Sequence, residues 1–474
     1  MADEPAPAPL CVDLDGTLLR TDALYETVMV LLARNPLYLF LLPFWLLQGK
    51  AFLKKKIAER AHLDPALLPY DSRVLQLLHE TPARPRVLCT ASDAIIAKSV
   101  AAHLGCFEET LSSNGELNLS GHRKAAALVE RFGNRGFDYV GNGFIDLQVW
   151  AHARGAWVVN ASQGLARAAE KVTHVRATWP PPGSRVRAWL KAIRLHQWLK
   201  NILVFVPLLA SHQFFDIAVI AKSVLAFVAF GLCASGTYLL NDMLDLASDR
   251  AHHSKRRRPF AAGDLPVLHG MAVAPALTLL GFAIAIFCNP LFALVLALYY
   301  LTTLAYSFRL KRIVMVDVIT LAALYTIRII GGAAAIETAL SFWLLAFSMF
   351  MFLSLAMLKR YTELVAMRRD GRSHAKGRDY SVDDLSLVQS LGGACGYIAV
   401  LVACLYINSE TSAELYRRPE LLWLLCPMLL YWVSRAWLMA HRGKMHDDPL
   451  VFAARDRISL VLLGLAAIAA YLAI

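Results

Sequence analysis

The sequence predicts a multidomain protein, with an N-terminal α/β domain followed by an all-α bundle of nine transmembrane helices. Of its 474 residues, 57% are hydrophobic, and the mean hydropathy is +0.47. This composition is too apolar for an ordinary soluble protein. Residues 1–190 have a mostly soluble composition, whereas residues 200–474 contain apolar runs of bilayer length. Basic residues gather in alternate loops between these runs, which is typical of a multi-pass membrane protein.

Nine apolar runs are candidates for membrane-spanning helices. The loops after the second, fourth, sixth and eighth runs carry most of the basic residues. Cytoplasmic loops carry an excess of Lys and Arg, so this asymmetry predicts a protein of the plasma (inner) membrane with its N-terminal domain in the cytoplasm and its C-terminus outside. The runs lie at about 199–212, 220–240, 269–288, 290–308, 314–335, 341–358, 387–407, 420–440 and 457–474.

The charge, the cysteines and the first residues narrow the class of protein further. The net charge of +12 fits cytoplasmic loops beside anionic lipid headgroups, so we expect no nucleic-acid partner. The eight cysteines form no C-x-x-C pair and no metal spacing, which predicts reduced packing residues. The first ten residues contain acids and prolines but no basic segment before an apolar core, which predicts the absence of a cleavable signal peptide. No feature predicts the oligomeric state.

Three carboxylates follow directly after the second apolar run. On a helix, Asn241, Asp245 and Asp249 recur at i, i+4 and i+8 and share one face, and Asp242 neighbours Asp245 at i, i+3. Acids on one face repel one another unless a cation lies between them. Their oxygens suit Mg²⁺, which binds a few carboxylates together with substrate phosphates. We therefore expect Mg²⁺ as cofactor, Asp242 and Asp245 as catalytic residues and metal ligands, and Asn241 and Asp249 as further ligands.

A dense cationic segment comes next, from Arg250 to Pro259. An acidic face beside a basic loop is what an enzyme needs to hold a magnesium diphosphate and its anionic neighbour. The plain alternative is a solvated loop whose bases reflect membrane topology alone, but topology does not explain the acids. The candidate substrate-binding residues in this segment are Arg250, His252, Lys255 and Arg258.

Four further polar patches lie at the same predicted membrane face. Any one of them is explained by topology, but all of them on the side of the aspartates predict a phosphate-binding vestibule. The patches are Arg194–Asn201, Tyr306–Arg312, Lys359–Leu364 continuing to Arg378–Tyr380, and Asp447–Asp456.

Charged residues also fall within the apolar runs. Asp317, Arg328 and Arg435 lie in the fifth and eighth runs, where charges usually face the bundle interior or a polar cavity. For Asp317, a position near the membrane boundary is the alternative. The candidate substrate-binding residues in the runs and patches are Lys200, Asn201, Tyr306, Lys311, Arg328, Lys359 and Arg360.

These motifs resemble those of the UbiA-type intramembrane prenyltransferase superfamily over about residues 190–474. The resemblance is carried by the nine candidate spans, by R-x-H-Q-W-x-K-N at Arg194–Asn201 and by N-D-x-x-D-x-x-x-D-R-x-H-x-x-K-x-x-R-P at Asn241–Pro259. The second aspartate-rich motif of aromatic prenyltransferases is absent. The element D-D-P-x-x-F-A-x-x-D at Asp447–Asp456 favours the polyprenyl-phosphate phosphoribosyltransferase branch, although His253 stands where that branch commonly has proline.

Membership of that branch implies transfer of 5-phosphoribose from phosphoribosyl pyrophosphate to polyprenyl phosphate, a lipid of the bilayer, with release of pyrophosphate. The resemblance also implies that Mg²⁺ and the diphosphate lie on the aspartates and that Lys255 and Arg258 neutralise phosphate. A cationic sugar transition state needs such neutralisation of its leaving group. One alternative is a prenyltransferase that uses a prenyl diphosphate and an aromatic or other acceptor. Another is a transporter or lipid-binding scaffold.

A second acidic motif, D-x-D-G-T, begins at Asp13 after a short apolar run. Asp13 and Asp15 point to one side of a strand, and such a pair can form and hydrolyse an aspartyl-phosphate with Mg²⁺ bridging. The motif resembles that of haloacid-dehalogenase phosphatases over about residues 8–172. The resemblance implies a Rossmann-like domain with a helical cap and the catalytic residues Asp13 and Asp15. It implies phosphate binding by Thr90, with Ser92 as an alternative, and by Lys124, and metal binding by Asp13, Asp15, Asn142 and Asp146.

Asn142 replaces the usual aspartate of that family, so two interpretations of the N-terminal domain stay open. An active phosphatase would remove the 5-phosphate of the lipid-linked product and give polyprenylphosphoryl-ribose, a donor for cell-envelope glycans. The alternative is an inert or regulatory remnant. The predicted boundaries are 1–175 for this domain, with its cap at about 18–85, 176–192 for a stiff linker, and 193–474 for the transferase domain.

The segment Pro36–Gln48 within the predicted cap is strongly apolar but too short to span a bilayer. Lys54, Lys55 and Lys56 follow it. Apolar residues beside bases predict a cap that rests on the membrane surface. An ordinary pair of buried cap helices explains the segment nearly as well.

Overall fold

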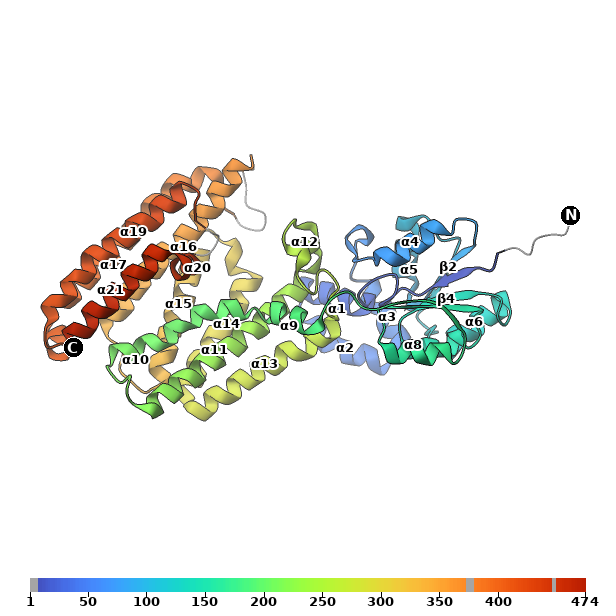
Figure 1. Cartoon of the computed structure of the whole chain (residues 1–474), viewed down its shortest axis with the longest axis horizontal. Coiled ribbons are helices and arrows are strands. Elements are labelled where there is room, and N and C mark those ends of the chain that lie inside the picture. Colours follow the sequence, from blue (N-terminus) through green and yellow to red (C-terminus); the bar gives the residue numbers. More distant parts are fainter. Residues whose placement is uncertain (1–6, 372–378, 446–448) are drawn as a thin grey trace. The chain divides into compact units, whose positions relative to one another are not determined.

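The computed structural model describes residues 7–371, 379–445 and 449–474. The chain forms two compact units (Figure 1). The first combines Met1–Arg194 with Tyr238–Pro275, and the second combines Leu195–Thr237 with Ala276–Ile474. The segment with the acidic motif of residues 241–249 thus packs with the N-terminal part of the chain.

The first unit is built on a six-stranded sheet with the strand order β3-β2-β1-β4-β5-β6. Every neighbouring pair is parallel, so helices return the chain between strands. This confirms the predicted α/β, Rossmann-like arrangement. The strands are β1 (Leu10–Val12), β2 (Arg86–Asp93), β3 (Glu109–Ser113), β4 (Asp138–Gly141), β5 (Gly155–Val159) and β6 (His174–Trp179).

Helices cover both faces of the sheet because each strand turns alternate apolar side chains toward two cores. Leu10 and Val12 of β1 pack into one core, and Cys11 packs into the other. The first core includes α4 (Ser72–Glu80) and α5 (Ala94–Leu104), and the second includes α6 (His122–Phe132), α7 (Leu147–Trp150) and α8 (Gln163–Glu170). Since β1 lies between β2 and β4, the residues after these three strands meet at one edge of the sheet.

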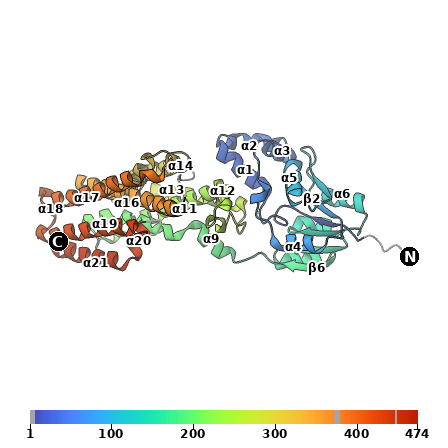
Figure 2. The same cartoon turned by 90° about the horizontal axis from the view of Figure 1, so that it is seen from above.

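Besides α4, three α-helices lie between β1 and β2 in the sequence, where the resemblance implied a cap. They are α1 (Ala23–Arg34), α2 (Tyr38–Leu47) and α3 (Lys50–Ala58), and Figure 2 shows them grouped to one side of the sheet. The Asp22 side chain caps α1 by accepting a hydrogen bond from the Leu24 N–H. None of the ten residues of α2 is buried, so the interpretation of this segment as a buried cap helix is wrong.

The rest of the first unit consists of short pieces and of helix ends that continue into the second unit. Helix α9 (Arg185–Ile193) lies almost wholly within residues 176–192, where a linker was predicted. The end of α11 (Ile217–Leu244), α12 (Leu246–Ala251), η4 (Lys255–Arg257) and the start of α13 (Val267–Cys288) complete the unit. Other short helices in the chain are η1 (Pro65–Leu67), η2 (Phe144–Asp146), η5 (Leu310–Arg312), η6 (Val382–Asp384), α18 (Glu410–Leu415), η7 (Pro419–Leu424) and α20 (Pro449–Arg455).

In the described part of the chain, seven helices are long and apolar enough to cross a membrane, which makes this a multi-pass membrane protein. Five are α11, α13, α14 (Pro290–Phe308), α15 (Val316–Ala335) and α16 (Phe342–Arg369). The other two cover Val382–Ile407, with α17 (Leu385–Ile407), and Pro419–His441, with α19 (Leu425–His441).

The predicted count of nine spans is not confirmed among the described residues. The expected first span is divided into η3 (Leu195–Phe205) and α10 (Val206–Ala210), neither of which reaches bilayer length. The expected last span is α21 (Arg457–Ala473), which has 17 residues. Apolar composition alone therefore overestimated the number of long helices.

Helix α15 lies at the centre of the second unit, since 72% of the residues in an apolar stretch of 18 within it are buried. Small residues near its end permit close packing against η3. A Cβ atom at Gly332 would lie 2.1 Å from the carbonyl oxygen of Val204, so only glycine fits there.

Candidate functional site

The acidic motif lies where α11 gives way to α12. Asn241 and Asp242 are in the last turn of α11, and Asp245 is the N-cap residue of α12. The predicted single helix is thus interrupted at Asp245. Two helical backbone bonds nevertheless persist, from Asp245 N–H to the Asn241 carbonyl at 2.9 Å and from Asp249 N–H to the Asp245 carbonyl at 2.8 Å. The spacing that brings these residues to one side is therefore largely kept.

Two of these aspartates are buried and share one arginine. Asp242 and Asp249 are each 2% exposed. Nη1 of Arg258 lies 3.0 Å from Oδ1 of Asp242 and 2.7 Å from Oδ2 of Asp249. Arg194 also donates to Oδ1 of Asp242. The repulsion expected among the acids is thus offset by two guanidinium groups.

The donor set of this motif fits a magnesium ion. Oδ2 of Asp242 is buried and has no hydrogen-bond partner among the described residues, which leaves one anionic oxygen uncompensated. Asp245 is only half-buried. Hard oxygens from Asn241, Asp242, Asp245 and Asp249 are the ligand type that Mg²⁺ prefers. In the described part of the chain, no three His, Cys, Asp or Glu side chains already form a cluster suited to a metal ion.

The predicted substrate-binding bases of this segment lie in three different environments. Arg258 lies at the aspartates, as described above. Arg250 instead donates to the Glu26 carboxylate of α1 and to the Ala261 carbonyl at 2.8 Å, so internal partners occupy it. His252 and Lys255 are exposed.

The candidate residues of the second unit form two buried polar clusters. Nε of Arg328 donates to Oδ1 of Asn201 at 2.9 Å, and its Nη2 donates to the Tyr299 hydroxyl at 3.0 Å. Asp317 is 0% exposed, pairs with Arg360 at 2.7 Å and accepts a hydrogen bond from Tyr380 at 2.7 Å. The predicted interior location of the charges in the fifth run is therefore confirmed for both residues.

Other candidates of the second unit are less deeply placed. Arg435 donates two hydrogen bonds to the carboxylate of Asp456, at 2.7 and 2.9 Å. Asp456 is the last residue of the D-D-P-x-x-F-A-x-x-D element that supported the resemblance. Arg378, Asp447 and Asp448 lie outside the described residues. The half-buried candidates are Lys200, Tyr306, Lys311 and Lys359.

A second polar centre lies at the edge of the sheet, where β1 and β4 end. Nζ of Lys124 lies 2.8 Å from Oδ1 of Asp13 and donates to the Tyr139 hydroxyl at 2.9 Å. That hydroxyl donates to Oδ1 of Asp146 at 3.1 Å. The other Asp146 oxygen accepts from the backbone N–H groups of Asn142 and Gly143, at 3.0 and 2.9 Å. The sheet thus brings together Asp13, Lys124, Asn142 and Asp146.

Asp15, two residues after Asp13, is held by two donors. It accepts from the Ala23 N–H at 2.8 Å and from the Ser92 hydroxyl at 2.6 Å. Ser92, which the resemblance gave only as an alternative to Thr90, therefore provides the hydroxyl that contacts Asp15. Thr90 is fully buried and accepts from the Ser92 N–H at 3.0 Å.

Sequence reasoning missed two residues of this centre. Tyr139 links Lys124 to Asp146, but an aromatic residue inside a buried strand carries no motif signal. Lys54 of α3 donates to the Ala91 carbonyl at 2.6 Å and to Asn118 at 3.0 Å. Its place in a run of three lysines after an apolar segment had instead suggested a position facing the membrane surface.

Burial controls the titration of this centre. Loss of water raises the pKa of Asp13 to about 7, against the opposing charge of Lys124. Burial likewise lowers the pKa of Lys54, although Asp15 and Asp22 oppose this shift. The oxygens of Asp13, Asp15, Asn142 and Asp146 are suited to Mg²⁺ by type.

Comparison with known proteins identifies the family to which this arrangement belongs. Residues 202–376 match the UbiA prenyltransferase family. The uncharacterized protein y4nM of Sinorhizobium fredii is 37% identical over 456 residues, covering 95% of this chain and 88% of that protein. Nodulation protein NoeC of Azorhizobium caulinodans is 39% identical, covering 59% of this chain and 91% of that protein. The chain belongs to the UbiA prenyltransferase family and is an enzyme.

Two further comparisons concern parts of the chain. A decaprenyl-phosphate phosphoribosyltransferase of Mycobacterium tuberculosis is 38% identical over 200 residues, covering 41% of this chain and 66% of that protein. A solved UbiA homolog from Archaeoglobus fulgidus bound to GPP and Mg²⁺ is 15% identical with a TM-score of 0.45. The matched region covers 60% of this chain and 97% of the Archaeoglobus fulgidus homolog.

Proposed function

We propose that this protein transfers 5-phosphoribose from phosphoribosyl pyrophosphate to polyprenyl phosphate and releases pyrophosphate. The observation that carries the proposal is the buried pair Asp242 and Asp249, bridged by Arg258, with one Asp242 oxygen left without a donor. The similarity to proteins named decaprenyl-phosphate phosphoribosyltransferase supports this choice of substrates.

The residues of the motif have separate roles in this transfer. Asn241, Asp242, Asp245 and Asp249 would hold Mg²⁺, which supplies positive charge to the diphosphate when bound. Arg258 and the exposed Lys255 oppose the remaining negative charge of the leaving group. An oxygen of the lipid phosphate attacks C1 of the ribose, the C1–O bond breaks, and its electron pair leaves with pyrophosphate. The lipid phosphate is already anionic, so no strong general base is needed.

The proposed location follows from the same chemistry. The acceptor lipid stays in the bilayer, and the sugar donor is soluble, so the reaction belongs at a membrane surface. We propose that the protein lies in the plasma (inner) membrane with its N-terminal part in the cytoplasm, on the side of the basic loops.

We propose that the N-terminal part is a phosphatase that removes the 5-phosphate of the lipid-linked product. Asp13 attacks phosphorus, the ester P–O bond breaks, and the departing ribose oxygen takes a proton from Asp15. Water then attacks the aspartyl-phosphate, Asp15 takes its proton, and inorganic phosphate leaves. Lys124 keeps Asp13 oriented at 2.8 Å, and Mg²⁺ on Asp13, Asp15, Asn142 and Asp146 would neutralise the phosphate.

Label transfer tests the first step. Membranes carrying the protein receive labelled phosphoribosyl pyrophosphate, polyprenyl phosphate and Mg²⁺. We expect label in the organic phase, lost with Asp245→Asn or EDTA and kept with Glu414→Gln, which removes an exposed acid elsewhere. No transfer from this donor, with label moving instead from a prenyl diphosphate to an aromatic acid, would show that the prenyltransferase alternative is correct.

Phosphate release tests the second step. The lipid-linked phosphoribose product is incubated with unsubstituted protein, with Asp13→Asn and with Glu116→Gln, whose acid is exposed. We expect phosphate release with the unsubstituted protein and with Glu116→Gln, but not with Asp13→Asn. Equal release by Asp13→Asn would exclude the N-terminal centre and leave the inert or regulatory interpretation.

A further inference from the structure

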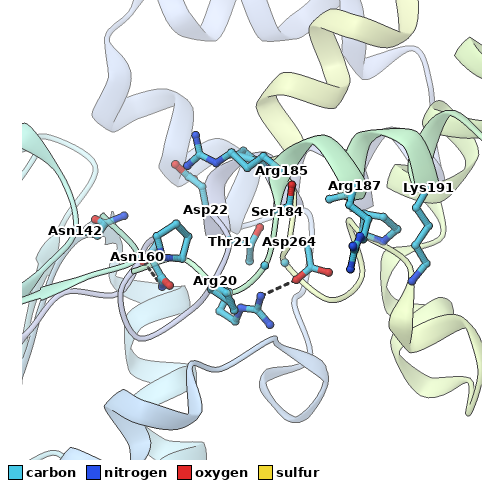
Figure 3. A pocket seen from close by; sticks show the side chains of 18 of the residues that line it. Arg20, Thr21, Asp22, Asn142, Asn160, Ser184, Arg185, Arg187, Lys191 and Asp264 are labelled. Carbon is cyan, nitrogen blue, oxygen red and sulfur yellow. Dashed lines mark hydrogen bonds and ion pairs between the residues drawn. The ribbon is translucent and has the colours of Figure 1, made fainter. Parts of the chain in front are cut away.

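The first unit contains a pocket of about 400 Å³ beside the Asp13 centre (Figure 3). Asp15, Gly16 and Asn142 line one end of it. Helix α9 and the segment from Pro259 to Pro266, which follows the basic loop, line the rest. The pocket therefore joins the phosphatase-like centre to a segment that comes directly after the transferase motif in the sequence.

Three cations of α9 line this pocket, and α9 contains no acid. They are Arg185, Arg187 and Lys191, all exposed. Arg187 and Lys191 are spaced at i, i+4, and Figure 3 shows them projecting from the same side of the helix. Lys191 donates to the Arg257 carbonyl, a neutral group, so its charge remains uncompensated.

The acids of the pocket are located elsewhere and have partners. Asp264 pairs with Arg20 at 2.6 Å. Asp15 accepts from Ser92 and Ala23, and Asp22 caps α1. Among the described residues, Arg185 and Arg187 have no ion-pair or hydrogen-bond partner, so an anion entering the α9 side meets unpaired guanidinium groups.

We propose that the pocket binds the second anionic group of a phosphatase substrate that carries two phosphates. The phosphomonoester would lie at Asp13 and Lys124, the sugar in the pocket, and a phosphodiester on Arg187 and Lys191. This proposal rests on the phosphatase step above and adds the residues that would recognise the second phosphate of its substrate. The size of the pocket is that of a small-ligand site.

Kinetics of the full-length protein in detergent micelles test this assignment. The probes are ribose 5-phosphate, with one phosphate, and ribose 1,5-bisphosphate, with two. We expect Arg187→Ala to lower the ratio of kcat/KM for the bisphosphate over that for the monophosphate by about tenfold, since a charge-assisted hydrogen bond is lost. Arg187→Lys should restore part of the ratio. Arg167→Ala, which removes an exposed arginine of α8, is the matched control.

These measurements distinguish failure of the pocket assignment from failure of the phosphatase step. An unchanged ratio in Arg187→Ala, with both probes hydrolysed, would overturn the pocket assignment and leave the phosphatase step intact. Absence of hydrolysis would overturn the phosphatase step. In that case, titration of ribose 1,5-bisphosphate into the protein and into Arg187→Ala shows whether the pocket binds it, and equal affinities would overturn the assignment as well.

Helix α2 carries a second, independent inference. From Pro36 to Gly49 the chain has no charged residue, and no residue of α2 is buried. Phe40, Phe44 and Leu47 are 70%, 63% and 84% exposed. An apolar face of this kind on a soluble surface is rare unless it meets a partner.

The packing of α1, α2 and α3 indicates the partner. Their shared apolar cluster, which includes Leu31, Trp45 and Ile57, also contacts Met271. Met271 is the fifth residue of α13, a helix that is long and apolar enough to cross a membrane. The cluster thus lies about one helical turn from the start of that helix. Bases flank α2 at Arg34, before it, and at Lys50 and Lys55 of α3, all three exposed.

We infer that α2 lies in the headgroup region of the bilayer and holds the first unit at the lipid surface. Its apolar side chains would continue the lipid-facing surface of α13, and the flanking bases would face anionic headgroups. Trp45, with the Arg60 guanidinium 5.2 Å from its ring, has the amphipathic character typical of that depth.

Photocrosslinking tests this inference in the full chain. p-Benzoylphenylalanine replaces Phe44, or the exposed Leu117 as control, in liposomes of phosphatidylcholine and phosphatidylglycerol. We expect lipid adducts by mass spectrometry at position 44 and none at 117. A crosslink from position 44 to a second copy of the chain, or no lipid adduct, would overturn the inference.

Discussion

Arg250 forms a two-bond ion pair with Glu26, although 224 residues separate them in the sequence. Both side chains are buried, at 8% and 1% exposure. The arginine belongs to the basic segment after the aspartate motif, and the glutamate belongs to α1. The pair therefore ties the phosphatase-like part of the chain to the transferase motif within one compact unit.

Breaking this pair should destabilise the first unit. Glu26→Gln leaves Arg250 buried without a counter-charge, which costs about 3–5 kcal/mol in comparable buried pairs. We expect a lower thermal midpoint in detergent and faster proteolysis within α1. The double variant Glu26→Leu/Arg250→Met should regain much of the loss, because no lone charge stays buried. A double variant less stable than either single one would contradict this account.

Arg258 should be required for the proposed transfer through charge and geometry together. One nitrogen of Arg258, Nη1, contacts both Asp242 and Asp249. Arg258→Ala therefore leaves Asp249 without its counter-charge and Asp242 with Arg194 alone, and it removes one cation from the proposed diphosphate site. We expect kcat/KM to fall about 100-fold. Arg258→Lys should be intermediate, because an ammonium group lacks the fork geometry. The neighbouring exposed Arg256→Ala is the control, and an equal loss there would refute a specific role.

The proposed phosphatase step should lose activity in acid. Burial raises the pKa of Asp13 to about 7, and only the carboxylate is nucleophilic. Below that pKa, kcat/KM for a phosphate ester should fall about tenfold per pH unit. Removing the opposing cation with Lys124→Gln should move the midpoint to higher pH. A profile from pH 5 to 9 measures this, and an unmoved midpoint would show that Lys124 does not control Asp13.

Asn142 sets the charge of the phosphatase-like centre. Its side chain rests against Gly16, where a Cβ atom would lie 2.0 Å from Nδ2, and its backbone N–H binds Asp146. Asn142→Asp adds one carboxylate to the proposed Mg²⁺ ligands, so we expect half-maximal phosphate release at lower Mg²⁺ concentration. Titration with Mg²⁺ checks this, with Asn134→Asp on the surface as control. An increased Mg²⁺ requirement would argue against Asn142 as a ligand.

The sequence alone predicted the α/β part, the membrane bundle and the main polar centres, because local patterns encode them. A short, continuously apolar strand such as β1 is typical of a buried parallel sheet, and a transmembrane helix needs an apolar run of bilayer length. The acids at Asp13 and Asp242 were found because each directly follows an apolar element. Their neighbours at Tyr139 and Lys54 were not found, since contacts between distant segments leave no periodic signal.

Only the tertiary structure decided how the polar residues are used. Arg250 and Arg258 have the same charge and lie eight positions apart, yet one binds Glu26 and the other the aspartates. Likewise, composition could not tell whether α2 is buried or exposed, because burial depends on which surfaces meet after folding. The sequence determines which chemical groups are present and their local spacing, whereas packing determines which of them are paired, buried or left available to a ligand.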